Sequence, residues 1–260
     1  MLARTLDKTP AYRFTTFDEN HVAHAVFTRL GGVSAAPYDS LNIGATVGDE
    51  PANVQRNMDL LYQAMQVGCG QVASPRQVHG KRVVRVGREA GGVVIPDCDG
   101  LVTDESGLYL LMRFADCAAV LLHDPTRKAI GLAHAGWQGT LLRVTEVLVA
   151  RMQAEFGSQP AEMVAAVGPS IGPCCLEIGP EVVAKVNTML PDAAQVVSRF
   201  APDGHAYLDI WQANRNQLER SGVGQIEMPG ICTRCSQQIF YSHRGSRGIT
   251  GRFGVVIGLR

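Results

Sequence analysis

LYLLMRFADCAAVLLHDPTRKAIGLAHAGW, residues 108–137, is the stretch of sequence that decides the fold. It contains three apolar runs of strand length, at 108–112, 118–122 and 129–133. The turn-forming pair Asp124-Pro125 separates the second run from the third. An antiparallel pairing of the second run with the third would bring the start of one beside the end of the other.

Strand and helix patterns continue on both sides of this stretch. Further strands are predicted at 21–28, 81–86, 163–167 and 253–259, and helices at 53–67, 140–156, 180–190 and 209–220. These elements are mixed without regular alternation, which favours an α+β fold over a doubly wound sheet. No linker, repeat or low-complexity segment interrupts the chain, so we expect one domain over residues 1–260.

The bulk composition excludes several classes of protein. Lys plus Arg and Asp plus Glu both number 24, so the net charge is zero and no basic stripe indicates nucleic-acid binding. No apolar run is long enough to span a membrane, and residues 1–10 lack the apolar centre of a signal peptide. Seven cysteines, an odd number, favour reduced thiols. We therefore expect a cytoplasmic protein; the sequence leaves its oligomeric state open.

Three short segments carry side chains that could bind a metal. Cys117 opens one predicted strand and His134 closes the next, so antiparallel pairing would place them side by side. Together with His79 they form a zinc ligand set that leaves the fourth tetrahedral position to water, whose pKa would fall to about 7. Asp116 is a candidate acceptor for the N–H of a ligand imidazole. The sequence thus predicts a metal site at His79, Cys117 and His134, with Cys117, His134 and Asp116 as catalytic residues.

The other histidines and cysteines are expected to play ordinary structural roles. Histidines outside this set are interpreted as polar residues without a metal, namely His21, His24, His123 and His205. Cys232 and Cys235 form a C-x-x-C motif, but no second such motif completes a structural zinc site. A redox role is an alternative for this pair. Cys174 and Cys175 are adjacent in sequence and are not expected to serve one site together.

Motifs of several enzyme classes are absent. The chain has no phosphate loop, no G-x-G-x-x-G dinucleotide loop, no H-E-x-x-H and no G-x-S-x-G. The zinc deaminase signature is also missing. No H-x-H pair occurs, although we would expect such pairs in a protein that binds several copper ions through histidine.

The chain resembles the YfiH family, also called the laccase-domain or multicopper polyphenol oxidase family. The matching stretches run in family order along almost the whole sequence: 29–34 (RLGGVS), 41–44 (LNIG), 77–80 (QVHG), 99–103 (DGLVT), 115–117 (ADC), 133–137 (AHAGW), 167–175 (VGPSIGPCC), 232–233 (CT), 241–244 (YSHR) and 250–252 (TGR).

This resemblance implies a fold, a metal and a set of activities. The implied fold is a single multi-layer α+β domain with mixed sheets flanked by helices, similar to that of deamidating toxins with a Cys/His dyad. The implied metal is held by His79, Cys117 and His134. The implied chemistry is phosphorolysis of adenosine, inosine, guanosine and methylthioadenosine, together with deamination of adenosine. Oxidation of phenols with copper and editing of peptidoglycan precursors are also attributed to the family.

The sequence departs from the family pattern near the expected site. Gln138 stands where the family usually has arginine, and glutamine provides neither the charge nor the five-donor fork that suits phosphate. Phe114, preceded by Arg113, replaces a usual threonine, and Leu176 replaces a frequent tyrosine. Our hypothesis is that Arg113 replaces the missing arginine if its side chain reaches the site.

A zinc-dependent purine nucleoside enzyme is the favoured function, with nucleoside and phosphate as small-molecule substrates. Candidate substrate-binding residues lie in or beside the family-like segments: Asn42, Gln77, Arg113, Ser170, Arg244 and Arg252, with Arg56 and Arg76 as further candidates for binding the anion.

Three alternatives remain open from the sequence. The first is a peptidoglycan-precursor amidase that uses either metal-activated water or Cys117 with His134. The second is a copper-dependent polyphenol oxidase. This is the weakest, because one three-ligand site cannot supply the four electrons that reduce dioxygen to water. The third is a partner-binding protein with a structural zinc, for which we find no fourth ligand.

Overall fold

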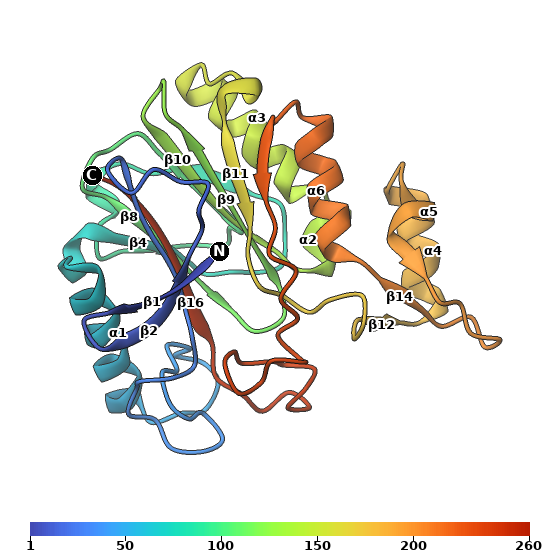
Figure 1. Ribbon diagram of the computed structural model, residues 1–260, viewed down its shortest axis with the longest axis horizontal. Coiled ribbons are helices and arrows are strands. Elements are labelled where there is room, and N and C mark those ends of the chain that lie inside the picture. The colour runs from blue at the N-terminus through green and yellow to red at the C-terminus, as the bar shows by residue number, and fades with distance from the viewer.

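The three apolar runs of residues 108–133 form strands that belong to two different sheets in the computed structural model, which describes residues 1–260. They are β8 (Tyr109–Phe114), β9 (Ala118–Asp124) and β10 (Ala129–Ala135). The predicted antiparallel pairing of β9 with β10 is confirmed, with His134 opposite Ala119. Strand β8 lies in the other sheet. Residues 115–117 therefore carry the chain from one sheet to the other (Figure 1).

The first sheet has seven strands, and its middle is built from distant parts of the chain. It is antiparallel except where β4 pairs with β8 and β6. Its strands in spatial order are β1 (Leu2–Leu6), β2 (Thr9–Arg13), β3 (Val22–Phe27), β16 (Phe253–Leu259), β8, β4 (Val72–Pro75) and β6 (Val94–Ile95).

The second sheet has six strands and contains β9 and β10 at its centre. Parallel pairs lie at both of its edges, and the pairs between them are antiparallel. Its strands in spatial order are β15 (Gln225–Glu227), β11 (Val164–Val167), β9, β10, β7 (Gly100–Thr103) and β5 (Val83–Arg85).

The two sheets pack face to face and helices cover their outer faces, which gives four layers. Leu121 of β9 and Leu132 of β10 join the apolar cluster between the sheets, which also contains Met112 of β8. The alternate residues of β9, Val120 and Leu122, point to the helical side. Both faces of the central strands are buried, so their sequences are continuously apolar. The shared core supports the proposal of one domain over residues 1–260.

The helices lie on opposite sides of the paired sheets (Figure 1). Helix α1 (Pro51–Met65) covers the seven-stranded sheet. The six-stranded sheet is covered by α2 (Trp137–Leu141), α3 (Val144–Phe156) and α6 (Ile210–Arg220), which begins at the side-chain cap Asp209. The predicted continuous helix at 140–156 was wrong in one respect. Arg143 takes a left-handed conformation (φ 60°) and separates α2 from α3.

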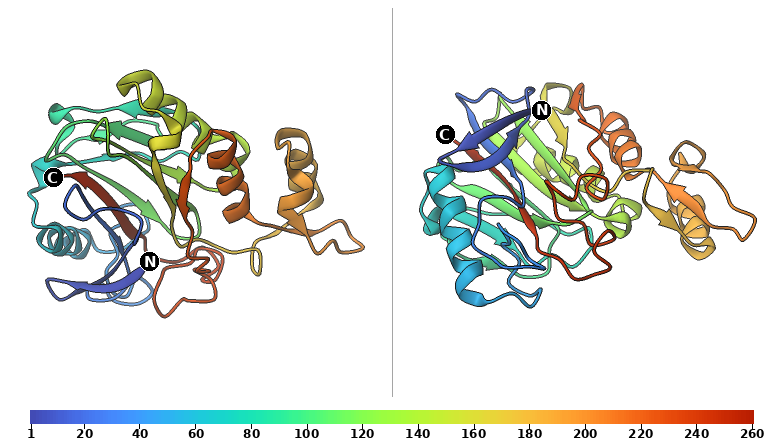
Figure 2. Two further views of the ribbon diagram at one scale, coloured as in Figure 1. Left: turned by 45° about the horizontal axis from the view of Figure 1, so that its top comes forward. Right: turned by 60° about the horizontal axis from the view of Figure 1, so that its bottom comes forward.

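A small unit projects from the side of the sandwich, as both views of Figure 2 show. It contains a three-stranded sheet of β12 (Glu177–Ile178), β14 (Ala206–Leu208) and β13 (Val197–Ser198), with helices α4 (Pro180–Met189) and α5 (Ala193–Val196). Of these elements the sequence predicted only α4, since strands of two or three residues carry no clear periodicity. The α+β fold class is confirmed, and none of the helices is long and apolar enough to cross a membrane.

His24 on β3 should make the stability of the protein depend on pH. The ring is fully buried between Phe14 and Phe17, and its Nε2 accepts a hydrogen bond of 2.9 Å from the Phe14 N–H. Burial lowers its pKa to about 4. Between pH 6.5 and pH 4 the unfolded chain therefore binds more protons at His24 than the folded chain does. The contribution of neutral His24 to the free energy of unfolding is fully present above pH 6.5, and it is lost as the pH falls through this range.

We expect His24 to account for a loss of about 2 kcal/mol in unfolding free energy between pH 7 and pH 5. Urea unfolding of His24→Gln should show a correspondingly flatter pH dependence. The exposed neighbour His21 provides the control His21→Gln, which should keep the wild-type slope. Equal slopes in all three proteins would show that His24 is not the responsible group.

Candidate functional site

The three side chains predicted as metal ligands meet at the crossing between the two sheets. His79 follows β4 in a loop, Cys117 ends the crossing segment, and His134 lies near the end of β10. The ligand atoms of all three lie within 4.8 Å of one another. The imidazole rings of His79 and His134 are tilted by 75°, with their centroids 4.8 Å apart. The antiparallel register of β9 and β10 is therefore what brings the thiol beside the ring of His134.

Asp99 holds the ring of His134 and the backbone of His79 in place from a fully buried position beside β7. Its Oδ1 lies 2.8 Å from Nδ1 of His134, which leaves Nε2 of that ring for a ligand. The same carboxylate accepts hydrogen bonds from the backbone N–H groups of His79 (2.9 Å) and Gly80 (2.7 Å). These bonds support His79 at φ 60°, which is unusual for a residue with a side chain.

Asp116 does not serve as the acceptor that the sequence predicted. Its Oδ1 accepts from the hydroxyl of Thr233 at 2.7 Å, and its Oδ2 accepts from the backbone N–H of Arg244 at 2.6 Å. Asp116 itself lies at φ 87°, at the bend that leads into Cys117. The acceptor for His134 is Asp99 instead, because β7 lies beside β10 whereas Asp116 faces the loops near the C-terminal end. Asp116 therefore positions the thiol and Arg244.

Gly136 is required by the close approach of backbone and thiol. A Cβ atom at this position would lie 2.8 Å from Sγ of Cys117 and 3.2 Å from Cδ2 of His79. The absence of a side chain at Gly136 thus leaves room for two of the three ligand side chains. The equivalent Cβ at Gly80 would meet an Asp99 oxygen at 3.4 Å and a Val78 side-chain carbon at 3.7 Å, both ordinary contacts.

The charges of the cluster suit a thiolate. Burial alone raises the pKa of Cys117, but the charge of His134 and hydrogen bonds from His134 and His79 outweigh it and lower the pKa to about 6. Burial likewise opposes protonation of His134, yet the charge of Cys117 and the bond to Asp99 raise its pKa to about 9. Since metals bind the thiolate rather than the thiol, a thiolate beside two imidazoles fits a zinc-type ion.

A pocket of about 720 Å³ opens over this cluster. One part of its wall is apolar. The ring of Trp137 provides an aromatic surface there, whereas Leu176, which replaces a frequent tyrosine of the family, is aliphatic. Its lining includes the cluster residues His79, Cys117 and His134, the arginines Arg76, Arg113, Arg244 and Arg252, the polar residues Gln77, Asp116, Gln138 and His243, and the apolar residues Trp137, Ile171, Leu176 and Ile210.

Three of the predicted substrate residues use their polar groups inside the protein. Asn42 and Ser170 are fully buried and do not line the pocket. The Oδ1 of Asn42 accepts the backbone N–H of Arg252, and the hydroxyl of Ser170 accepts the indole N–H of Trp211. Gln77 lines the pocket, but its amide pairs with both backbone groups of Arg113 at 2.9 Å. Asn42 and Ser170 therefore shape the pocket from behind its wall. Gln77 keeps a second amide N–H, and its role in substrate binding stays a prediction.

Arginines from three parts of the chain do reach the pocket. Arg113 on β8 donates through Nε to the carbonyl of Ile43 at 2.9 Å, and burial lowers its pKa. Arg244 and Arg252 each donate through Nη1 to backbone carbonyls, and both retain further N–H groups. Arg76 also lines the pocket and pairs with the exposed Asp97, whereas Arg56 does not line it. The pocket thus combines positive charge with the metal-type cluster.

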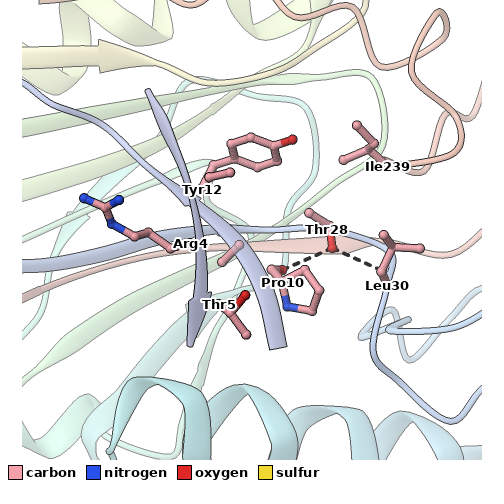
Figure 3. Close-up of a pocket in the computed structure, with 9 residues that line it drawn as sticks. Arg4, Thr5, Pro10, Tyr12, Thr28, Leu30 and Ile239 are labelled. Carbon is pink, nitrogen blue, oxygen red and sulfur yellow. Dashed lines mark hydrogen bonds between the residues drawn. The ribbon is translucent and has the colours of Figure 1, made fainter. Parts of the chain in front are cut away.

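A second, smaller depression lies away from this chemistry. Figure 3 shows it between the β1–β2 hairpin, Leu30 and Ile239, where the hydroxyl of Thr28 bridges the Pro10 carbonyl and the Leu30 N–H. Its volume is about 370 Å³, and no cysteine, histidine or carboxylate lines it. It offers none of the groups that the candidate site provides.

Comparisons with known proteins agree with the resemblance read from the sequence. Residues 23–260 match the family described as multi-copper polyphenol oxidoreductase laccase. A protein of Geobacillus stearothermophilus named purine nucleoside phosphorylase YlmD is 36% identical over 90% of this chain and 88% of its own length. A purine nucleoside phosphorylase of Deinococcus radiodurans is 39% identical over 92% of this chain and 89% of its own. The crystal structure of Bacillus licheniformis YfiH is 33% identical, covers 94% of both chains and has a TM-score of 0.90.

Asp99→Asn should weaken zinc binding roughly 10- to 100-fold, because groups that orient a ligand imidazole typically affect metal affinity by this amount. An NH2 group would replace one carboxylate oxygen, and this group donates hydrogen bonds but does not accept them. The remaining oxygen could not accept from both the His134 ring and the backbone N–H groups of residues 78–80. The affinity can be measured by competition with a chromophoric chelator. Asp97→Asn, at an exposed neighbouring carboxylate, is the control. Unchanged affinity in Asp99→Asn would contradict the assigned role.

Proposed function

We propose a function for this chain on the premise that it belongs to the multi-copper polyphenol oxidoreductase laccase family. The chain is an enzyme, as the names of its relatives indicate. We propose that it is a zinc-dependent purine nucleoside phosphorylase acting on adenosine, inosine, guanosine and methylthioadenosine, and that it also deaminates adenosine. Nucleoside and phosphate are its small-molecule substrates.

One observation carries this proposal: a single pocket holds arginines, an apolar wall and the His/Cys cluster together. Its volume of about 720 Å³ lies in the range of small-molecule sites. Trp137 and Ile171 offer surfaces for a purine ring, since an aromatic or aliphatic face can pack on its flat side. Arg252 is near enough to the cluster that the charges of Cys117 and Asp116 act on its pKa, which burial lowers.

Phosphorolysis requires that phosphate and nucleoside be held side by side. The free N–H groups of Arg113, Arg244 and Arg252 can bind hydrogen phosphate through charge-assisted hydrogen bonds. A phosphate oxygen then forms a bond to the anomeric carbon of the ribose, and the bond to the purine nitrogen breaks. The electron pair stays on the purine, which takes up the proton that hydrogen phosphate gives up. Positioning and neutralisation of the phosphate charge are the contributions of the arginines.

Deamination of adenosine needs a water molecule at the purine carbon that bears the amino group. The water oxygen bonds to that carbon and the amino group leaves as ammonia; one water proton goes to the ammonia and the other to the ring nitrogen. His79, Cys117 and His134 would hold zinc, which supplies Lewis-acid activation of water when bound. Asp99 keeps His134 in the tautomer that presents Nε2.

Amide hydrolysis is a second candidate, and one observation favours it. Cys117, His134 and Asp99 stand in the order of a nucleophile, a base and a group that orients the base. In this reading the thiolate of Cys117 would attack the amide of a peptidoglycan precursor. The two readings make different demands on Cys117, because a thiolate that binds zinc is a poor free nucleophile.

Incubation of the metal-replete protein with adenosine, with and without phosphate, tests the proposed function. We expect adenine and ribose 1-phosphate only when phosphate is present, and inosine under both conditions, measured by liquid chromatography. Cys117→Ala should lose the zinc ion of this site and inosine formation, whereas the exposed Cys69→Ala should retain both. If wild-type protein forms no product under either condition, the proposal fails. A folded wild type without metal would favour the Cys117/His134 amidase.

Arg113 should provide the phosphate-binding charge that Gln138 lacks, since both residues line the pocket. We expect Arg113→Ala to raise KM for phosphate roughly 10- to 100-fold, because a hydrogen bond to a charged group contributes about 1.5–3 kcal/mol. Adding Gln138→Arg in that background should restore the wild-type KM. Arg127→Ala, outside the pocket, is the control. Failure of the second substitution to rescue would show that Arg113 does not compensate for Gln138.

A further inference from the structure

Four cysteines that the candidate site does not use meet at a second place in the molecule. Cys174 and Cys175 follow β11, and Cys232 and Cys235 follow β15. Their four sulfurs lie within 4.8 Å of one another. The Sγ atom of Cys235 lies 3.7 Å from that of Cys174 and 3.5 Å from that of Cys175. The turn of the chain thus directs both adjacent thiols to the C-x-x-C motif, a convergence that the sequence does not predict.

The spacing of these sulfurs matches a tetrathiolate metal site. Four sulfurs placed tetrahedrally at about 2.3 Å from one zinc ion lie about 3.8 Å from each other. We propose that Cys174, Cys175, Cys232 and Cys235 bind a structural zinc ion, separate from the metal held by His79, Cys117 and His134. Four thiolates complete the tetrahedral coordination, so this ion has no open position for a substrate.

The surroundings of the cluster support a bound thiolate centre. The backbone N–H of Gly172 donates to Sγ of Cys232 at 3.3 Å, and Cys232 is buried. Four thiolates and one zinc ion carry a net charge of −2, and two guanidinium groups lie beside the cluster. Arg234 donates to the carbonyl of Cys175 at 3.4 Å, and Arg199 donates to the carbonyl of Pro173. Cys174 and Cys235 are exposed, which gives an ion access to the thiols.

The backbone already aligns the two segments that the ion would join. Ser170 and Cys232 form a parallel β-bridge. The backbone N–H of Ser170 donates to the carbonyl of Ile231 at 3.2 Å, and the backbone N–H of Thr233 donates to the carbonyl of Ser170 at 3.1 Å. The turn at Cys232 is closed by the N–H of Ser236, which donates to the Cys232 carbonyl at 3.0 Å. Short loops of this kind preset the thiols, so metal binding needs little further ordering of the chain.

The position of the cluster explains what such an ion would do. Ile171 and Leu176, on one of the two joined segments, line the active pocket. Thr233, on the other segment, donates to the Asp116 carboxylate that positions Arg244. The first segment also leads directly into β12 of the projecting unit (Figure 2). A zinc ion at this place would fix one wall of the pocket and the root of the projecting unit together.

Counting zinc in five proteins tests the proposal. Protein purified without chelator or added metal and analysed by elemental analysis should contain two zinc ions per chain in wild type and in Cys69→Ser, a matched exposed cysteine outside both clusters. We expect one zinc ion per chain in Cys235→Ser, one in Cys117→Ala and none in the double variant. Equal zinc in Cys235→Ser and Cys69→Ser would overturn the proposal.

Cys117→Ala provides a test that does not depend on the folding of Cys235→Ser. With the first site removed, the remaining zinc should be replaceable by cobalt with the intense visible absorption of a tetrahedral thiolate complex. Chelation should expose four additional thiols to a chromogenic thiol reagent and lower Tm. The site would be refuted if folded Cys117→Ala protein contained no metal. It would also be refuted if the intact mass under non-reducing conditions showed disulfides among these four cysteines. Loss of nucleoside activity alone would bear only on the first site, so failures of the two proposals are distinguishable.

Discussion

The buried carboxylate of Asp99 is the constraint on which the geometry of the site depends. Its two oxygens accept from the ring of His134 and from the backbone of residues 78–80. The pKa of Asp99 is lowered despite burial, because the bond to His134 and those from the backbone favour its charged form. One anion therefore fixes the ring of His134 on β10 and the backbone of the loop that carries His79. A neutral or shorter side chain could not hold both.

The main elements of the fold could be predicted because their sequences carry strong periodicity. Helix α6 and its cap Asp209, the pair β9–β10 and the last strand, β16, lie where the apolar patterns indicate. The assignment of β8 to a different sheet could not be predicted, since its apolar run is like that of β9. The break at Arg143 was also hidden, because the apolar spacing of residues 140–156 continues through it. Pattern reveals an element, but tertiary packing decides its partner.

The part of the candidate site that can be predicted from the sequence is the part whose chemistry follows from the type of residue alone. His79, Cys117 and His134 are distinctive, and their convergence agrees with the strand pairing. The roles of carboxylates and amides depend instead on which neighbour their oxygens meet. Asp99 lies in a family-like segment, but no pattern in the sequence marks it as the partner of His134, whereas the sequence favours Asp116 because it is next to Cys117. The four-cysteine cluster was missed for a similar reason, since its halves are about sixty positions apart.

The place of β16 in the first sheet has a consequence for how the protein is made. It is the last strand in sequence, yet it pairs with β3 on one side and β8 on the other, in the interior of the sheet. While residues 253–259 are still inside the ribosome, a nascent chain has two unpaired strand edges and an open slot between them. Such edges can pair with other chains. Co-translational folding must therefore leave this sheet unfinished until β16 is available, and the arginine that precedes β16, Arg252, reaches its pocket only when the slot is filled.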